Sequence, residues 1–321
     1  MSVNIRARQL GLTIAVFILA FCAWGASAPR MKSATTPAQT PAAAAQQTDD
    51  EDQQRQLFAK EFLQARPTAG QRRNPRPPRV PGTASQSNAD RVSDMLGITL
   101  WRLRPAAAND DTQARLLEQE ADSEVVLVGE RVNSETTFKE GQKVRLSVES
   151  PRTGYLYVID REQYADGTYS EPYLIFPTLK TRGGDNAVIA GRLIEIPDQD
   201  DRPFYFKMTR HRPDQSGEVL TFLITAQPLP NLQLGRKALK LTPEQFAQWE
   251  QKWKAPARRV EMANHAGKTY TKVEMTAGST KTALLGRDDP PPQTIFRITG
   301  RTSEALMVTV PLRYEMSKVQ K

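Results

Sequence analysis

The sequence contains a single cysteine, Cys22, among 321 residues. Cys22 lies inside an apolar N-terminal segment, so the rest of the chain has neither an intramolecular disulfide nor a thiolate for catalysis or metal binding. Histidine is almost as scarce, because only His211 and His265 occur, both in polar, loop-like surroundings. A Ser-His-Asp triad or a multi-histidine zinc site would have to use one of them. These scarcities predict a fold that depends on a hydrophobic core, with no metal and no cofactor.

The N-terminus has the three parts of an export signal. Two arginines precede an apolar run, and the small residues Ala26 and Ala28 follow it. Cleavage after Ala28 would leave a proline at the new N-terminus, which disfavours that cut. Since about twenty apolar residues span a bilayer, residues 10–28 are also long enough to attach the chain to the membrane. We predict a signal peptide or a signal anchor at residues 1–28, and an extracytoplasmic location in the periplasm or at the cell surface.

The next region, residues 29–85, has few large apolar side chains. Residues 29–49 consist mainly of Ala, Thr, Pro and Gln, which cannot bury enough surface to offset the entropy lost on ordering. We predict a disordered Ala/Pro/Arg-rich spacer. Within it, apolar residues at helical spacing indicate a short helix at residues 50–65, whose apolar face is available to a partner or to the chain's own domain.

Residues 66–82 combine five arginines with five prolines. The prolines favour an extended chain that cannot pair into a sheet. Such a stretch can lie along an anionic polymer of the envelope or serve as a stiff linker. The candidate contacts are Arg72, Arg73, Arg76 and Arg79. A formal net charge of +8 favours anionic envelope surfaces, and an exported protein gives no reason to expect nucleic acid.

From residue 86 onward the sequence changes to strand patterns. Residues 143–149 alternate polar and apolar side chains, which is typical of a strand with one solvent-exposed face. Further strands are predicted at residues 98–103, 125–132, 155–159, 173–176, 193–196, 204–208, 219–226, 294–299 and 306–314. Many short strands without alternating helices favour an antiparallel sandwich or barrel. We predict a mainly β fold, with a β-sandwich-like domain at residues 86–230 and a C-terminal extension at residues 231–321 packed on it.

The C-terminal extension contains one well-signalled helix, at residues 243–253. Thr242 is placed to cap it, and Gln245 three residues later completes a capping box. Three aromatic residues line one face: Phe246, Trp249 and Trp253. Such a face can dock on a sheet or bind sugar rings, and docking is the interpretation adopted.

The stretch most like a site is DREQYADGTYSEPYLIFP, residues 160–177. A calcium loop needs oxygen ligands at alternate positions and glycine at the sixth, but the fifth and sixth residues here are Tyr164 and Ala165. Asp166-Gly167 lies instead between two apolar strands, and an Asp-Gly turn matches the twist of a β-hairpin. We predict a hairpin with a long, tyrosine-bearing tip and no metal site.

Three other patterns are assigned to structure rather than to chemistry. AGKTYT, residues 266–271, ends like a phosphate loop but lacks the first glycine, so residues 260–263 and 273–276 are predicted to form a hairpin around it. RGGDNAVIAG, residues 182–191, is predicted to be a surface loop. A carboxylate pair for glycoside hydrolysis could be drawn from five residues, which are interpreted instead as solvated strand faces: Glu149, Asp160, Glu162, Asp166 and Glu195.

Four landmarks resemble a bacterial domain of unknown function, the DUF4384 family. They are GYLYVIDRE at residues 154–162, an acidic hairpin, YLIFPT at residues 173–178 and AGRLIEIP at residues 190–197, preceded by FKEGQKVRLSVES at residues 138–150. The likeness covers about residues 138–228. The resemblance implies a β-rich bacterial module, often beside signalling kinases, caspase-like peptidases or helical repeats, with no catalytic residues to assign.

The landmark residues also have structural interpretations. Gly154 admits a turn into a strand that is predicted to be central and buried on both faces. Pro177 and Pro197 are predicted to end strands, where no further ladder donor is needed. The residues assigned to structure are Gly154, Tyr155, Tyr157, Asp166, Gly167, Phe176, Pro177, Gly191 and Pro197.

These patterns favour a non-catalytic binding or scaffold module of the bacterial cell envelope. Its partner would be an unidentified envelope protein or an anionic envelope polymer. The candidate binding residues are the four spacer arginines and three tyrosines expected to form an exposed aromatic patch, Tyr164, Tyr169 and Tyr173. The alternative is an envelope hydrolase acting on glycan or peptide, which requires carboxylates that converge in a cleft with raised pKa values.

Overall fold

The computed structural model describes residues 41–66, 68, 91–120, 123–279, 283–301 and 305–315. Within these residues the chain forms two β-sheets and three α-helices, so the predicted mainly β, sandwich-like fold is confirmed. Gln46–Lys321 belongs to one compact unit.

Most of the N-terminal predictions fall outside the described residues. This holds for the signal segment at residues 1–28 and for the arginine-rich part of the spacer. The predicted short helix is present as α1 (Pro41–Ala65), which begins nearer the N-terminus than the sequence pattern indicated. None of the helices in the described part of the chain is long and apolar enough to cross a membrane.

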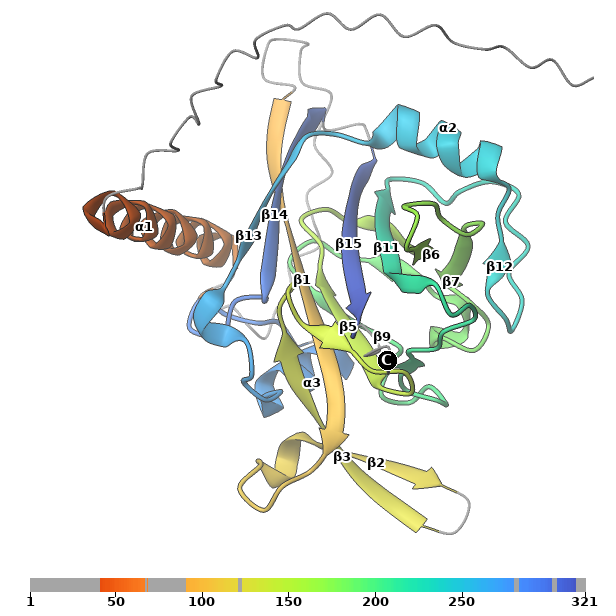
Figure 1. The fold of residues 1–321 in the computed structure, drawn as a ribbon, viewed down its shortest axis with the longest axis horizontal. Coiled ribbons are helices and arrows are strands. Elements are labelled where there is room, and N and C mark those ends of the chain that lie inside the picture. The colour runs from red at the N-terminus through yellow and green to blue at the C-terminus, as the bar shows by residue number, and fades with distance from the viewer. Residues whose placement is uncertain are drawn as a thin grey trace, which may run out of the picture. The chain divides into compact units, whose positions relative to one another are not determined.

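Among the described residues, the first sheet, sheet A, has eight strands. They are β1 (Arg91–Pro105), β2 (Arg115–Glu120), β3 (Ser123–Val132), β5 (Lys143–Glu149), β9 (Leu193–Ile196), β10 (Phe206–Lys207), β13 (Ala257–Glu261) and β14 (Thr294–Arg301). The strand order is β10-β5-β1-β14-β13, and β9 also pairs with β5. One edge of β1 is shared, because its first half pairs with β14 and its second half with β3. The β2–β3 hairpin projects from this second half, after the short helix η3 (Thr112–Ala114) (Figure 1).

Sheet B has seven strands in the described residues. They are β4 (Thr137–Phe138), β6 (Gly154–Tyr164), β7 (Tyr173–Phe176), β8 (Ala187–Val188), β11 (Gln215–Thr225), β12 (Leu239–Lys240) and β15 (Leu306–Tyr314). The order is β12-β7-β6-β11-β15-β4, with β8 beside β6. Because β14 lies within sheet A and β15 within sheet B, residues 231–321 contribute strands to both sheets.

The inner faces of the two sheets share one hydrophobic core. Leu146 and Val148 enter it from sheet A, and Val158, Phe222 and Val308 enter it from sheet B. Period-two alternation directs the intervening residues of each strand to the outer faces.

Strand β6 is central and buried on both faces, as its sequence predicted. Leu156 and Val158 face the shared core, whereas Tyr157 and Ile159 belong to a second cluster on the outer face of sheet B. Gly154 allows close backbone approach, because a Cβ atom there would lie 2.2 Å from the carbonyl oxygen of Thr225. As predicted, β7 ends at the residue before Pro177 and β9 at the residue before Pro197.

The outer face of sheet B is covered by α2 (Pro243–Trp253), which has the predicted bounds. The Thr242 hydroxyl accepts a hydrogen bond of 3.1 Å from the backbone N–H of Gln245. Phe246 is buried in the outer cluster, and the rings of Trp249 and Trp253 stack with centroids 6.1 Å apart. The aromatic face docks on the sheet, as expected.

The outer face of sheet A differs from its prediction. The polar residues of β5 were expected to face solvent, but Arg145, Ser147 and Glu149 are each no more than 3% exposed. The chain after β13 passes over this face and carries α3 (Lys272–Ser279), which contacts β9. Local alternation cannot reveal such a cover, because the covering residues lie more than a hundred positions away.

The predicted hairpin of residues 260–263 and 273–276 is wrong. Its first arm pairs with β14 as part of β13 and then enters the short helix η5 (Ala263–His265), whereas its second arm lies inside α3. A capping box explains the helix: Thr271 N–H donates to Glu274 Oε2 at 3.2 Å, and Glu274 N–H donates to the Thr271 hydroxyl at 3.3 Å.

Candidate functional site

The acidic tract of residues 160–177 is a hairpin, as predicted. Strands β6 and β7 pair antiparallel, and the chain reverses at Asp166-Gly167. Gly167 has a φ of 84°, and its N–H donates to the carbonyl oxygen of Tyr164 at 3.0 Å. Asp166 Oδ1 accepts from Thr168 N–H at 2.9 Å, and these Thr168 bonds lower the pKa of Asp166. Among the described residues, no group of three or more His, Cys, Asp or Glu side chains is arranged to hold a metal ion.

Two carboxylates of this hairpin meet a third from β11. Asp160 and Glu162 share one face of β6, and Glu218 lies directly opposite Glu162 in the register. This is the face that carries the shared core, and the acids follow the last apolar residues at one end of it. Glu162 Oε1 lies 2.5 Å from His211 Nδ1, and the Tyr314 hydroxyl donates to Glu218 Oε1 at 2.8 Å.

Two of these carboxyl groups, Asp160 and Glu218, hold protons more tightly than isolated ones. Burial raises the pKa of Glu218 to about 7, and the charge of Glu162 adds to this effect. Burial also raises the pKa of Asp160 well above its usual value, with further contributions from Glu218 and Glu162. Asp160 Oδ1 is buried without a hydrogen-bond partner in the described part of the structure. At neutral pH this cluster is therefore partly protonated.

The five carboxylates considered from sequence do not meet at one place. Glu149 and Glu195 are buried on the outer face of sheet A, where they pair with Arg66 and Arg145. Their interpretation as solvated residues is therefore wrong. Glu218 was not among the candidates, because only its register opposite Glu162 brings it into the group.

The three candidate tyrosines are separated. Tyr164 is only 8% exposed, and its hydroxyl donates to Glu162 Oε2 at 2.8 Å. Tyr169 is exposed on the outer side of sheet B, where its ring contacts Arg161. Tyr173 is also exposed, but it lies directly opposite Asp160 in the β6–β7 register and so shares the inner face of sheet B with Asp160. Tyr169 and Tyr173 therefore point to opposite faces of the sheet. The predicted patch of three tyrosines is wrong, and a binding role for Tyr169 and Tyr173 stays a prediction.

The landmark residues lie on β6, β7 and their neighbours. Tyr155 and Tyr157 face the outer cluster, Phe176 faces the shared core, and the Tyr157 hydroxyl accepts from Leu229 N–H at 2.8 Å. Gly191 has a φ of 72° in the turn before β9. The arginines Arg72, Arg73, Arg76 and Arg79 lie outside the described residues.

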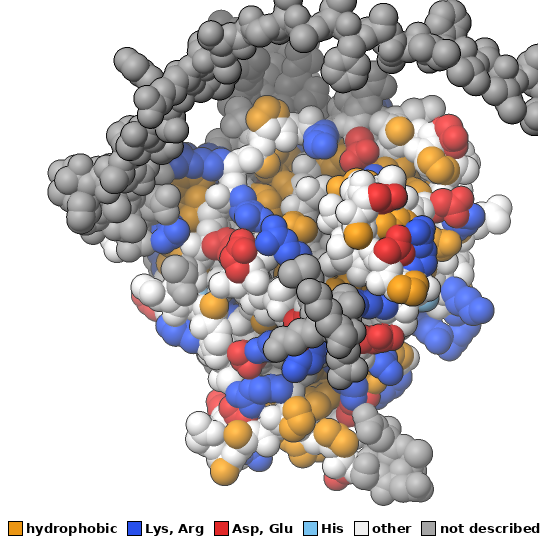
Figure 2. Space-filling view, in the orientation of Figure 1, with side chains coloured by type: hydrophobic (Ala, Val, Ile, Leu, Met, Phe, Trp, Pro, Cys, Tyr) orange, Lys and Arg blue, Asp and Glu red, His pale blue; other side chains and the backbone are white. Residues whose placement is uncertain are grey.

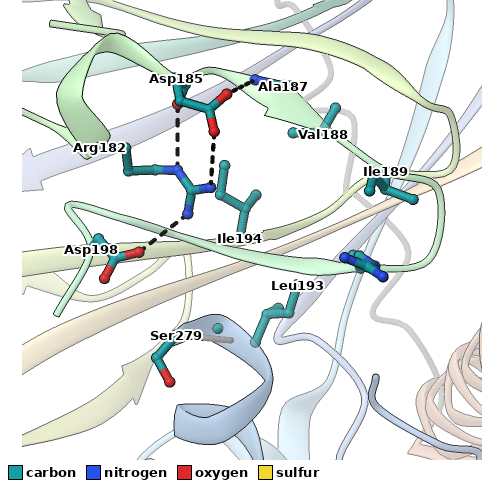
Figure 3. Close-up of a pocket in the computed structure, with 11 residues that line it drawn as sticks. Arg182, Asp185, Ala187, Val188, Ile189, Leu193, Ile194, Asp198 and Ser279 are labelled. Atoms are coloured by element: carbon teal, nitrogen blue, oxygen red, sulfur yellow. Dashed lines mark hydrogen bonds and ion pairs between the residues drawn. The ribbon is translucent and has the colours of Figure 1, made fainter. Parts of the chain in front are cut away.

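A cavity of about 210 Å³ lies beside the segment that was predicted to be a plain surface loop (Figure 3). The short helix η4 (Arg182–Gly184), β8, β9 and the end of α3 contribute its walls. One wall is apolar and contains Val188, Ile189, Leu193 and Ile194. Ile189 is 41% exposed, so this wall is open to solvent at one position.

The polar wall of the cavity is centred on Arg182. Its Nη1 donates to Asp198 Oδ2 at 3.2 Å, and Asp185 lies on its other side, with Nη2 4.0 Å from Oδ2 (Figure 3). The Arg182 N–H also donates to Asp201 Oδ1 at 2.8 Å. The two side-chain contacts fix the guanidinium. Ser279 lines the cavity from the α3 side, and its hydroxyl donates to the carbonyl oxygen of Thr276 at 3.4 Å.

Sequence reasoning missed this cavity because its residues come from two distant segments, 182–198 and 278–279. The one local signal was an aliphatic pair, Val188-Ile189, within a Gly-rich loop. Only Ile189 of this pair is exposed. Neither family models, curated proteins nor solved structures give a match to this chain.

Proposed function

We propose that this protein is an exported, non-catalytic binding or scaffold module of the bacterial cell envelope, and that the cavity beside Arg182 is its binding site. The observation that carries the proposal is a fixed guanidinium facing an aliphatic wall that is open at Ile189. Binding sites commonly combine a mainly apolar lining with a few oriented polar groups. The export signal and the DUF4384-like landmarks in the sequence support an accessory role in the envelope.

The lining favours a peptide segment as the ligand. At about 210 Å³ the cavity is smaller than the roughly 300–1,000 Å³ of sites that enclose whole small molecules. It has room for an aliphatic side chain of a bound segment. Arg182 and Asp198 provide donors and acceptors for backbone amides. None of the eleven described lining residues is aromatic, which disfavours stacking against a sugar ring.

A charge substitution at the aliphatic wall tests this site. The exported chain, residues 29–321, is used to capture proteins from an envelope extract, and binding of each captured protein is then measured by calorimetry. Ile189→Asp should weaken binding by about tenfold or more, because a charge replaces apolar contact. Leu117→Asp is the matched control, since Leu117 is also an exposed aliphatic residue but lies on β2. Equal binding by both variants would remove the cavity from consideration.

The anionic-polymer partner is a separate part of the proposal and rests on the sequence of the spacer. Figure 2 shows acidic and basic side chains interspersed over the visible face, so attraction to a polyanion is assigned to the spacer arginines. Replacing Arg72, Arg73, Arg76 and Arg79 by Ser should reduce retention on an anionic envelope polymer and its salt dependence. Ile189→Asp should leave that retention unchanged.

The carboxylate cluster supports a second candidate, an envelope hydrolase acting on glycan or peptide. The favouring observation is Glu218, whose pKa is raised to about 7 opposite Glu162, as in an acid–base pair. Incubation with purified cell-wall polymer measures release of reducing ends and of free amines. Hydrolysis by the wild type that Glu162→Gln abolishes would favour the hydrolase over the binding module. Hydrolysis that persists in Glu162→Gln would assign the activity to another site or to a contaminant.

A further inference from the structure

Helix α1 packs on the outer face of sheet A through one narrow stripe. Phe58 and Phe62 are 5% exposed and contact Val260, Met262 and Ile295 of the sheet side. Figure 1 shows the helix beside β13 and β14. Its flank carries two polar contacts, since Arg297 pairs with Glu61 and Arg258 donates to Gln54. Leu57, next to Phe58, is 63% exposed and takes no part in the stripe.

The stripe ends in an arginine that enters the body of the protein. Arg66 is 2% exposed, and its Nε and Nη2 donate to the two carboxylate oxygens of Glu149 at 2.9 and 2.7 Å. Its Nη1 donates to the carbonyl oxygens of Asp289 and Pro290 at 3.2 and 3.1 Å. The guanidinium also lies 5.4 Å from the centre of the Phe62 ring. This geometry recognises the planar fork of arginine, which lysine cannot reproduce.

The helix does not fill the groove in which it lies. Space of about 310 Å³ remains at its C-terminal end beside Arg66, Met95 and Glu149. Further openings of about 580 and 210 Å³ lie along its two flanks, next to Phe58 and Ala59 respectively. Elements held by few apolar contacts have a low free energy of local opening. We therefore expect α1 to detach before the core unfolds.

The chain between the helix and sheet A does not restrict where the helix docks. Twenty-four residues, 67–90, separate Arg66 from β1. A segment of that length reaches about 80 Å at full extension, which exceeds the diameter of a domain. Docking on the chain's own body is favoured by effective concentration rather than by tight linkage.

We propose that the groove is a receptor for an amphipathic helix of the pattern Phe-x3-Phe-x3-Arg, and that α1 of a second copy of this chain binds there in exchange with the chain's own α1. The occupant is a second copy because the stripe, the arginine and the flanking contacts of α1 already match this groove. A reciprocal exchange satisfies both grooves and closes a two-fold dimer without any new surface. The inference is independent of the cavity beside Arg182.

A variant whose own α1 is released from the groove, here called the vacated variant, tests whether the groove binds such a helix. In the exported chain, Phe58→Asp together with Phe62→Asp releases α1, and Leu57→Asp is the matched control on the same helix. A fluorescent peptide of residues 46–68 should bind the vacated variant at least about tenfold more tightly than the wild type or the control, in which α1 competes at high effective concentration. An Arg66→Lys peptide should bind the vacated variant about tenfold less tightly than the native peptide.

The vacated variant must keep the near-ultraviolet circular dichroism of the wild type. If it does not, Arg66→Ala in the full exported chain takes its place in the same titration. A folded variant that binds no peptide, or that binds the native and Arg66→Lys peptides equally, would overturn the receptor.

Exchange between copies has its own measurement. In sedimentation velocity, the wild type mixed with the vacated variant should give a complex of two chains that excess peptide of residues 46–68 dissociates. The vacated variant alone should remain monomeric, because it has a groove but no competent helix. Peptide binding without any complex of two chains would overturn the exchange and would assign the groove to the chain's own helix or to a helix of another protein.

Discussion

Arg145 and Glu195 illustrate how this protein buries charge. Arg145 Nη2 donates to Glu195 Oε2 at 2.9 Å, and both side chains are at most 4% exposed on the outer face of sheet A. Burial raises the pKa of Glu195 to about 7, although the charge of Arg145 opposes this shift. The attraction between the two charges therefore only partly offsets the free energy needed to remove them from water, as is usual for buried ion pairs. Its structural consequence is that α3 must fit closely over it.

Gly278 of α3 provides the close fit. A Cβ atom at this position would lie 2.4 Å from Cδ of Glu195. We expect Gly278→Ala to lower the free energy of unfolding by about 1–2 kcal/mol, because the clash with a buried side chain outweighs the better helix propensity of alanine. Urea unfolding measures the change. Gly235→Ala, where the nearest atom would be 4.0 Å away, should shift stability by less than about 0.5 kcal/mol.

Glu218 makes stability depend on pH. Its pKa is about 7 in the folded protein against an ordinary value of 4.5, so the folded state binds more protons than the unfolded state between these values. The free energy of unfolding therefore falls as pH rises from about 4.5 to about 7 and stays low above that. Glu218→Gln cannot ionise and keeps an acceptor for Tyr314.

We expect Glu218→Gln to raise the free energy of unfolding, relative to the wild type, by on the order of 1–3 kcal/mol more at about pH 8 than at about pH 4.5. Urea unfolding at the two pH values measures the difference. Glu135→Gln serves as the control, because Glu135 is exposed on the surface. The same effect of Glu218→Gln at both pH values would contradict the raised pKa.

At the scale of single elements, α2 is the helix whose start is most clearly explained by its local sequence. Thr242→Ala removes the acceptor for the Gln245 N–H, and we expect a loss of about 1 kcal/mol in the free energy of unfolding. Because Trp249 and Trp253 stack on this helix, their fluorescence should report the loosening at lower denaturant than the global transition. Thr242→Ser keeps a hydroxyl and should restore most of the stability. Equal losses in both variants would remove the cap as the cause.

Elements with local signals were predictable from the sequence. The bounds of β5, β7, β9 and β15 agree with the apolar runs and alternation that predicted them, and α2 follows its cap. The Val273-Glu274-Met275-Thr276 stretch was misread because alternation of four residues fits a strand as well as a helix. The capping box of Thr271 and Glu274 was the available signal.

The candidate site was much less predictable, because tertiary contacts create it. The cavity joins Arg182 and Ile189 to Ser279, and no short-range pattern relates residues about ninety positions apart. Glu218 meets Glu162 only through the β6–β11 register. The burial of Glu149 likewise depends on Arg66, which lies in a segment that looked like a linker.

At the scale of the whole molecule, the C-terminal strands join the beginning of the domain to its end. β14 pairs with the first half of β1, with Arg91 opposite Arg301, and β15 lies between β11 and β4. Pairings across such sequence separations must wait for most of the chain, which predicts slow folding.

Removal of residues 294–321 should therefore abolish cooperative unfolding, because it takes an interior strand from each sheet. Calorimetry or urea titration of the truncated chain measures this loss. Removal of residues 316–321 alone, beyond the end of β15, should leave the transition near that of the full chain. A cooperative transition in the longer truncation would show that the remaining strands form a core by themselves.

The buried Arg–Glu pairs also constrain how this sequence can change over generations. Arg66–Glu149, Arg131–Glu274 and Arg145–Glu195 each join positions at least fifty residues apart. Loss of one partner leaves an unpaired charge in the interior and lowers the free energy of unfolding by about 3–5 kcal/mol. Replacing both partners by apolar residues is nearly neutral. In homologous sequences the two members of each pair should therefore be kept or lost together.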